Sequence, residues 1–577
     1  MRKIIPLLLI LALTLSGCLN PPVEPAPSGS IPVSTPTVND DDMFNEDDKT
    51  EPAPTGIAIN LNGSSASCSS NKVSISDSTV TIKSSGTYVI SGTLNNGSVV
   101  VNAQKTDEVN VILYGANITC QDNAPIRVLQ AKKVILTLSG GTENTITNGG
   151  HFPTGGEIII DGALFSKQDL TINGTGKLNI LSPAGHGIVC KDNLVITGGT
   201  FAIQSGSHGI DANDSFRFTN ATMEINCEKD GVHVENIEDT SLGFSYISSG
   251  TIIINAMGDG ISASSFSQIS SCTLQLTTGG GSKNGKNHPS QGAPGRPGLF
   301  QTADTDDTST KGIKSGTDLT ILSGEITIDS ADDALHANNS LLVSGGNIQI
   351  SAGDDACHAD QNLTISGGMM NINQSYEGLE AIHVVISGGN VKLTAQDDGI
   401  NAAGGNDESG GGGMDGGMFP GRPGKPGNSG SSSSKGSVTI SGGTLYIKAS
   451  GDGIDANGTL SITGGHTVVC GPTQGDTATL DFDNSGIITG GTFIGTGASG
   501  MMAQTFSGYE NQSVLSVSVS NQQAGTKITL KDSAGNIILT HEPELSFAVV
   551  ILSCPEIQSG QTYTLTVGSL SKEFTAS

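Results

Sequence analysis

Acidic residues recur at a nearly constant spacing in the part of the chain from 332 to 402. The repeated acidic position is filled by Asp333, Asp355, Glu377 and Asp398, which follow one another at steps of 22, 22 and 21 residues. A residue type that recurs with the period of a structural repeat lines up as a column along the stack of repeats. The spacing therefore predicts a column of carboxylates along a repetitive fold.

Such a column can bind a cation. Two unit charges about 5 Å apart repel by about 1 kcal/mol in water and by about 3 kcal/mol at an effective dielectric near 20. The acids must therefore raise their own pKa values or recruit a positive ion. Ca²⁺ suits a set made only of oxygens, because it takes about six to eight oxygen ligands in flexible geometry. The predicted calcium ligands are the repeated acids, the acids just before them and one further glutamate: Asp332, Asp333, Asp354, Asp355, Glu377, Glu380, Asp397 and Asp398.

A structural role competes with this interpretation. An Asp before Gly or Ala can cap a turn through its own backbone N–H groups. Capping accounts for one acid in each repeat. It does not account for the doubled acids at 332–333, 354–355 and 397–398, or for Glu377 together with Glu380.

A second polar column follows three residues after each repeated acid, and we expect it on the outward face. The supporting residues of the two columns are His336, His358, Asn401, Asp452 and Asp455. Imidazole is a poor calcium ligand but a good zinc or manganese ligand. We expect the two imidazoles to hydrogen-bond to adjacent carboxylates, and transition-metal ligation is the alternative.

Short apolar segments must position these columns. Between the acidic motifs lie pieces such as Leu341–Val343 followed by Ser-Gly-Gly, and then Asn347–Ile350. Three short strands in about 22 residues are typical of one coil of a parallel β-helix. The content of 80 glycines and no tryptophan also favours an all-β repeat protein. We predict the β-helix over 56–509 and a small antiparallel β module over 510–577.

The remaining segments predict where the protein is located. Arg2, Lys3 and the apolar run Ile4–Leu15 form an export signal over 1–18, which ends in a Leu-Ser-Gly-Cys resembling the bacterial lipobox. Lipidation of Cys18 would anchor the protein in the cell membrane, facing the extracellular side; an ordinary secretory signal is the alternative. Residues 19–55, rich in Pro, Ser, Thr and Asp, are expected to form a disordered tether. We expect a monomer.

Two further features concern loops and thiols. The Gly- and Pro-rich inserts at about 279–310 and 404–435 are expected to be mobile surface loops. Cys190 and Cys357 fall at inward positions of the repeat and should fill the core as small hydrophobes. A disulfide such as Cys68 to Cys120 stays open.

The motif series resembles a known family. Asp-Asp-Ala-Leu-His-Ala at 332–337, Asp-Asp-Ala-Cys-His-Ala at 354–359, Tyr-Glu-Gly-Leu-Glu at 376–380 and Asp-Asp-Gly-Ile-Asn-Ala at 397–402 are similar to clostridial carbohydrate-binding β-helix proteins. The resemblance implies a right-handed parallel β-helix, calcium sites and binding of plant cell-wall polysaccharides such as pectate or cellulose. The fold is also similar to that of calcium-dependent pectate lyases, although Asn401 replaces the last acid of their Asp-Asp-x-x-Asp motif.

Three functions stay open on the sequence. They are a surface-tethered polysaccharide-binding protein, a calcium-assisted lyase of acidic polysaccharide, and a structural spacer or adhesin. The absence of Trp and the presence of only 7 Tyr favour polyuronate over cellulose as the ligand. A lyase needs a base near the metal, and the candidates are Lys314 and Lys392, which can equally be solvated lysines. The net charge of −28 argues against nucleic acid, because neutralising phosphates needs Lys and Arg.

Overall fold

The computed structural model describes residues 37–155, 159–285, 309–402, 436–475 and 477–576. All of them belong to one compact unit, Thr35–Ser577. The predicted signal peptide with Cys18, the insert at 404–435 and most of the insert at 279–310 lie outside the described residues. No helix in the described part of the chain is long and apolar enough to span a bilayer.

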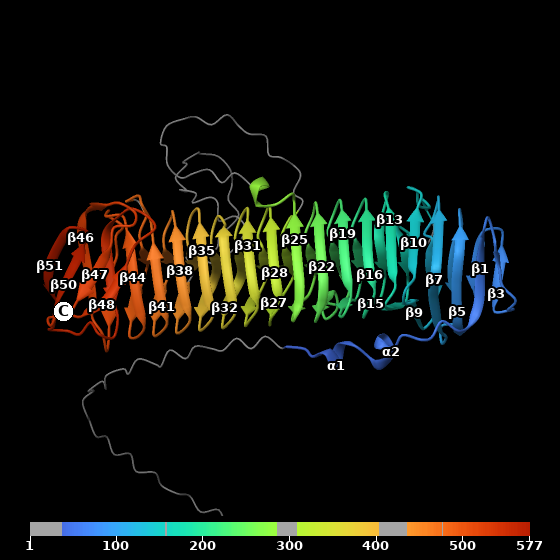
Figure 1. The fold of residues 1–577 in the computed structure, drawn as a ribbon, viewed down its shortest axis with the longest axis horizontal. Coiled ribbons are helices and arrows are strands. Elements are labelled where there is room, and N and C mark those ends of the chain that lie inside the picture. The colour runs from blue at the N-terminus through green and yellow to red at the C-terminus, as the bar shows by residue number, and fades with distance from the viewer. Residues whose placement is uncertain (1–36, 156–158, 286–308, 403–435, 476, 577) are drawn as a thin grey trace, which may run out of the picture. The chain divides into compact units, whose positions relative to one another are not determined.

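The chain forms a long sheet in which most strands pair in parallel with a strand of the neighbouring coil (Figure 1). Three series of strands alternate along the chain. The first series is β11 (Gly162–Ser166), β14 (His186–Cys190), β17 (Ile210–Ala212), β20 (Val232–Val234), β23 (Ile261–Ala263), β26 (Ile313–Ser315), β29 (Leu335–Ala337), β32 (Cys357–Ile365), β34 (Leu379–Ile386), β36 (Ile400–Ala402), β39 (Ile454–Ala456) and β42 (Leu480–Phe482). The second is β12 (Asp169–Gly174), β15 (Asn193–Ile196), β18 (Ser215–Phe218), β21 (Phe244–Ile247), β24 (Ser267–Ile269), β27 (Asp318–Ile321), β30 (Ser340–Val343), β37 (Ser437–Ile440), β40 (Thr459–Ile462) and β43 (Ser485–Ile488). The third is β13 (Lys177–Ser182), β16 (Thr200–Ser205), β19 (Thr222–Cys227), β22 (Gly250–Ala256), β25 (Cys272–Thr278), β28 (Glu325–Ser330), β31 (Asn347–Ala352), β33 (Met369–Gln374), β35 (Asn390–Ala395), β38 (Thr444–Ala449), β41 (His466–Cys470) and β44 (Thr492–Gly497).

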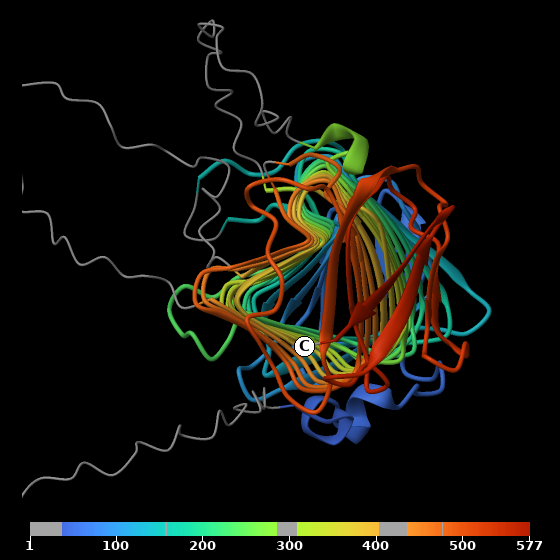
Figure 2. The same cartoon turned by 90° about the vertical axis from the view of Figure 1, so that its left-hand side faces the viewer.

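This arrangement confirms a nearly all-β, β-helix-like fold. Viewed along the stack, the strands of successive coils lie behind one another around a common interior (Figure 2). β32 and β34 each run through both the first and the second series, so the number of strands is not the same in every coil. The right-handed sense and the uniform coil of about 22 residues and three strands stay predictions.

The core is built from columns of like residues. Side chains alternate between the two faces of a strand, so one inward residue of each first-series strand pairs with its counterpart one coil away. The members of this column from Ile188 onward are fully buried: Ile188, Ile210, Val232, Ile261, Ile313, Leu335, Cys357, Leu379, Ile400 and Ile454. Cys190 and Cys357 are buried thiols, as predicted, and Cys68 and Cys120 are free rather than bridged.

The first strands open the stack and pair in the same parallel manner, apart from the short antiparallel pairings β1–β2 and β3–β4. These strands are β1 (Ile57–Gly63), β2 (Ala66–Ser67), β3 (Val73–Ser76), β4 (Thr79–Ile82), β5 (Gly86–Leu94), β6 (Ser98–Asn102), β7 (Glu108–Cys120), β8 (Ile126–Gln130), β9 (Lys133–Leu138) and β10 (Glu143–Asn148).

Residues 37–55, the described part of the predicted disordered tether at 19–55, pack against the strands instead. This segment contains the helical turns α1 (Asp40–Met43) and α2 (Glu46–Lys49). Phe44 packs with Tyr246, and the buried Asp48 accepts hydrogen bonds from Lys133 Nζ at 2.6 Å and Thr171 Oγ1 at 2.6 Å. The acidic, Pro-rich composition gave no sign of this, because the partners lie about 85 or more positions away in the chain.

Most of the C-terminal strands are antiparallel. β46 (Val514–Gln522) and β49 (Phe547–Ser553) extend the long sheet beyond β44 in this way, whereas β45 (Gly508–Tyr509) pairs in parallel with β43. β47 (Ile528–Lys531), β48 (Ile537–His541), β50 (Thr562–Val567) and β51 (Leu570–Thr575) form a separate four-stranded sheet. The only 3₁₀ helix in the described residues is η1 (Ser282–Asn284).

Candidate functional site

The repeated acid lies two residues before a first-series strand, and where it is an aspartate one of its oxygens caps the next coil. Asp333 Oδ1 accepts a hydrogen bond from the backbone N–H of Asp355 at 3.1 Å, and Asp355 Oδ1 accepts one from that of Glu377 at 3.3 Å. Asp230 Oδ1 does the same for Asp259 at 2.8 Å. The capping interpretation is therefore correct in kind, but in these coils the N–H group belongs to the following coil. Capping uses only one oxygen of each acid.

The second column stands in register beside the first. Lys314, His336, His358, Glu380, Asn401 and Asp455 pair in that order along β26, β29, β32, β34, β36 and β39. We predicted this column on the outward face of its strands, but its middle members are buried. His358 and Glu380 are each 1% exposed and His336 is 3% exposed. The imidazoles of His336 and His358 stack with centroids 4.7 Å apart, and each faces the acid of its own coil.

Lysine supplies the counter-charge at one end of the acidic region. Lys311 Nζ lies 2.5 Å from Asp333 Oδ2 and 3.2 Å from Asp332 Oδ1. His336 Nδ1 lies 2.9 Å from Asp333 Oδ2. Burial alone would raise the pKa of Asp333, but Lys311 and His336 hold that pKa well below its usual range. The ammonium group of Lys311 thus neutralises part of the charge of Asp332 and Asp333, and their role as calcium ligands stays a prediction. Asp354 groups with these two acids.

A buried triad follows in the next two coils. His358 Nδ1 lies 2.7 Å from Glu380 Oε2 and 3.4 Å from Asp355 Oδ2. Burial opposes the charge on His358, but the hydrogen bonds to Asp355 and Glu380 raise its pKa to about 12. Burial and the neighbouring acids hold the pKa of Asp355 well above its usual range, whereas burial of Glu380 is outweighed by its bond to His358, which lowers its pKa. The triad thus favours a charged imidazole on His358 and a charged carboxylate on Glu380, and it disfavours the charge on Asp355.

Beyond the triad the acids have no such compensation. Burial and then repulsion from Glu380 raise the pKa of Glu377 to about 8. Burial and then repulsion from Asp452 raise the pKa of Asp398 to about 9 and that of Asp455 to about 7. Within the described ranges, no Lys or Arg forms an ion pair with Glu377, Asp398 or Asp455.

Two buried oxygens in this region lack a hydrogen bond. Glu380 Oε1 and Asn401 Oδ1 have no partner among the described residues, although Asn401 Nδ2 donates to Glu377 Oε2 at 2.9 Å. Ligand oxygens of Asp398, Asp452 and Asp455 lie within 4.8 Å of one another. We call the following residues the oxygen cluster: Glu377, Glu380, Asp398, Asn401, Asp452 and Asp455. Unpaired buried acceptors cost free energy unless a donor or a cation reaches them.

Asp397 lies at the edge of the oxygen cluster. Burial and then a hydrogen bond to Asp397 raise the pKa of the Tyr376 phenol. A side chain at Gly451 would collide with Asp397 Oδ1 and Asp398 Oδ1. Gly451 is therefore needed for these two acids to approach the following turn.

Comparison with known proteins places the chain in a family. A family model described as carbohydrate-binding domain-containing protein matches residues 76–356. A protein of the same description from Acetivibrio thermocellus is 34% identical over 210 residues, which cover 36% of this chain and 73% of that protein. This chain belongs to the carbohydrate-binding domain-containing family. A solved structure, the polysaccharide lyase-like protein from C. thermocellum as a gadolinium derivative, is 28% identical with a TM-score of 0.38, covering 39% of this chain and 92% of that one.

The family match and the oxygen cluster occupy different parts of this carbohydrate-binding domain-containing protein. The matched residues end at 356, whereas the oxygen cluster begins at Glu377. The matched part contains a group that sequence reasoning did not single out as a site. In it the imidazoles of His186, His208 and His233 stack at 5.1 and 4.5 Å. The backbone N–H of Asp230 donates to His208 Nδ1 at 3.1 Å, so His208 caps a coil as the acids do elsewhere.

The two candidate bases of the carbohydrate-binding domain-containing protein lie apart from the oxygen cluster. Lys314 precedes His336, His358 and Glu380 in the second column. Lys392 lies on the outer face of β35, with Nζ 3.9 Å from Glu544 Oε1 and 5.4 Å from the ring centroid of Tyr446. Lys392 was a candidate base or a solvated lysine; its strand belongs to the third series, and its partners come from β38 and the C-terminal part.

Proposed function

We propose that the protein binds plant cell-wall polysaccharide at the cell surface, with Ca²⁺ held by the oxygen cluster. Family membership supports carbohydrate as the ligand. The observation that carries the metal proposal is the pair of unpartnered buried oxygens, Glu380 Oε1 and Asn401 Oδ1, beside acids that lack a counter-charge.

The donor set fits calcium. The oxygen cluster offers carboxylate and amide oxygens from neighbouring coils and no sulfur or nitrogen ligand. Hard cations such as Ca²⁺ prefer such ligands, and Ca²⁺ tolerates irregular geometry. The raised pKa values of Glu377 and Asp398 mean that protons neutralise part of the cluster when no metal is present. Calcium would replace these protons.

The net negative charge of the chain limits how the protein could bind an acidic polymer. At a net charge of −28, long-range attraction to polygalacturonate is absent or repulsive. Binding must then be local, and a partly coordinated calcium ion supplies open positions for a sugar carboxylate. The cellular setting belongs to the same proposal: Cys18 carries a lipid, and the chain acts as a monomer on the extracellular side of the cell membrane.

The test is polysaccharide binding with and without chelator. We expect the protein to bind polygalacturonate on a glycan array in calcium, to lose the binding in EDTA and to regain it when calcium is restored. Calcium should also raise the melting temperature. Binding to the folded state alone adds about 2.7 kcal/mol at a hundredfold excess over Kd. A melting temperature that responds neither to calcium nor to EDTA would remove the metal from the proposal.

A separate assay, the ultraviolet absorbance of unsaturated uronate, decides on the lyase alternative. Eliminating a sugar from a polyuronate needs a base close to the metal-bound residue, and neither Lys314 nor Lys392 forms an ion pair with the oxygen cluster in the described part of the chain. We expect no rise in ultraviolet absorbance from unsaturated uronate during incubation with polygalacturonate and calcium. A rise in absorbance that disappears in Lys314→Ala would instead support the lyase function, with Lys314 as its base.

A further inference from the structure

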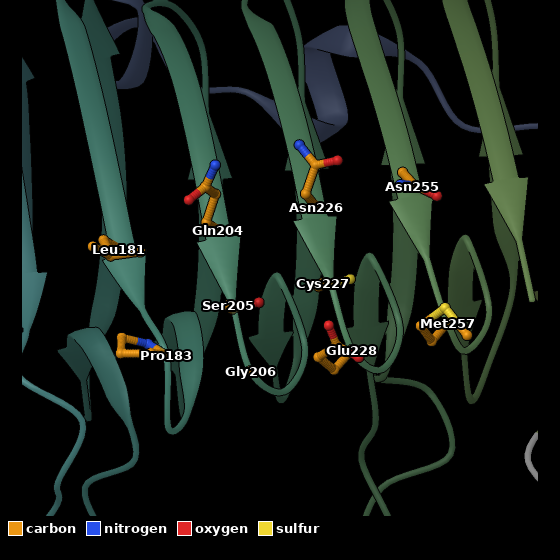
Figure 3. A pocket seen from close by; sticks show the side chains of 10 residues that line it. All are labelled: Leu181, Pro183, Gln204, Ser205, Gly206, Asn226, Cys227, Glu228, Asn255 and Met257. Carbon is orange, nitrogen blue, oxygen red and sulfur yellow. The ribbon is translucent and has the colours of Figure 1, made fainter. Parts of the chain in front are cut away.

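A row of free amides crosses the outer face of the third series, far along the chain from the oxygen cluster. Leu181, Gln204, Asn226 and Asn255 pair in that order on β13, β16, β19 and β22. Figure 3 shows the three amides on neighbouring strands, pointing to the same side of the sheet. None of the three amide side chains hydrogen-bonds to another described residue. We call Gln204, Asn226 and Asn255 the amide row.

The amide row borders a shallow hollow of about 390 Å³. At the ends of the strands the hollow is lined by Pro183, Gly206, Glu228 and Met257 (Figure 3). A side chain at Gly206 would collide with the backbone oxygen of Pro183, so glycine keeps this floor close to the preceding coil. The hollow therefore belongs to the stacked framework and needs no loop to form it.

Exposed apolar side chains lie next to the amides. Leu181 is 41% exposed, Met257 is 51% exposed, and Ile253, which precedes Asn255 on the same face, is 37% exposed. Large apolar side chains gathered at the surface beside polar groups mark ligand-binding grooves. An amide offers two donors and an acceptor, which matches sugar hydroxyl groups, and the apolar side chains match the C–H faces of sugar rings.

We propose that the amide row and its hollow bind a neutral, extended polysaccharide chain, independently of calcium. The inference rests on the proposed carbohydrate-binding function but not on its metal. The lining contains no Lys or Arg, and its charged member is Glu228, so a polyuronate would be repelled. Strands repeat at about 4.8 Å along the stack, close to the length of one sugar residue, so successive amides can meet successive sugars.

The position of the groove within the chain supports this assignment. All lining residues lie between 181 and 257, inside the part that matches the family at 76–356, whereas the oxygen cluster lies beyond it. The groove thus lies within the part of the chain that matches the carbohydrate-binding domain-containing family. The calcium-dependent contact with acidic sugars is a separate surface further along the same stack.

The test uses the full chain and a panel of xyloglucan, arabinoxylan and galactomannan, each measured by affinity electrophoresis in EDTA. The triple variant Gln204→Ala/Asn226→Ala/Asn255→Ala should bind the preferred neutral polymer at least tenfold more weakly than the parent protein. Asn226→Trp, which fills the hollow, should do the same. The matched control is Gln349→Ala/Asn371→Ala on β31 and β33, whose amides already bond to each other at 2.9 Å, and it should bind normally.

The outcomes separate this inference from the calcium proposal. Neutral binding that survives both the triple variant and Asn226→Trp overturns the inference, as does a parent protein that binds none of the three polymers in EDTA. Calcium-dependent binding of polygalacturonate should be unchanged in the triple variant. If the parent protein bound the neutral polymer but did not bind polygalacturonate in calcium, the calcium proposal would be refuted and the amide-row inference would stand.

Discussion

Replacing Lys311 with methionine should lower the free energy of unfolding by about 3–5 kcal/mol, which is the usual cost of removing one partner from a buried ion pair. Lys311 is 6% exposed and Asp333 is 2% exposed. Methionine fills a similar volume but leaves Asp333 and Asp332 without the ammonium group that lies 2.5 and 3.2 Å away. The carboxylates of Asp332 and Asp333 would then repel each other, as the acids of the oxygen cluster do.

Urea denaturation followed by circular dichroism measures this change. Lys392→Met is the matched control, because Lys392 is largely exposed and 3.9 Å from Glu544, and it should alter stability by less than about 0.5 kcal/mol. The double variant Lys311→Met/Asp333→Asn should regain part of the loss, since Asn keeps an oxygen to cap Asp355. A loss below about 1 kcal/mol in Lys311→Met would contradict the buried counter-charge.

The register of the columns could be predicted from the sequence because it depends on a period. Asp333 and Asp355 are 22 residues apart in the chain, and His336 pairs with His358 in the structure as the same step requires. Inward positions such as Cys357 followed from alternation along a strand. The period of the repeat predicts which residues are neighbours in adjacent coils. It does not predict which of their atoms are in contact.

The details of the site depend on such atomic contacts. Lys311 occupies the acidic position of its coil, and only the structure shows that its ammonium group reaches forward to Asp333. The burial of His358 and Glu380 could not be predicted from alternation, because it comes from stacking between neighbouring coils and from the acid column alongside. The ordered turns α1 and α2 depend on contacts with distant strands.

The amide row was missed for a different reason. Gln204, Asn226 and Asn255 are ordinary polar residues at outward positions, and nothing in their type marks a site. Their steps of 22 and 29 residues are the same as those from His208 to Asp230 and Asp259. Aligning the outward positions of successive coils by these steps of 22 and 29 residues would have identified the amide row in the sequence.

The double variant Glu377→Gln/Asp398→Asn should be more stable than the parent protein in EDTA near pH 8 and should no longer respond to calcium. In the parent, burial and like charges raise the pKa of Glu377 to about 8 and that of Asp398 to about 9. In the unfolded chain both are near 4. The folded protein therefore binds more protons between these values, and its stability must fall as pH rises from about 4 to about 8 or 9, by roughly 1.4 kcal/mol per pH unit for each group.

Thermal and urea unfolding from pH 4.5 to 9, in EDTA and in calcium, measures both effects. The parent should lose stability with rising pH in EDTA and lose less in calcium, because the metal takes the place of the protons. The double variant should show a flatter pH profile, no calcium increment and no calcium-dependent binding of polygalacturonate. Glu510→Gln, which removes an exposed acid outside the oxygen cluster, should behave as the parent does. If the double variant kept the calcium increment, the metal would have to lie elsewhere, and the two unpartnered oxygens of Glu380 and Asn401 would need another explanation.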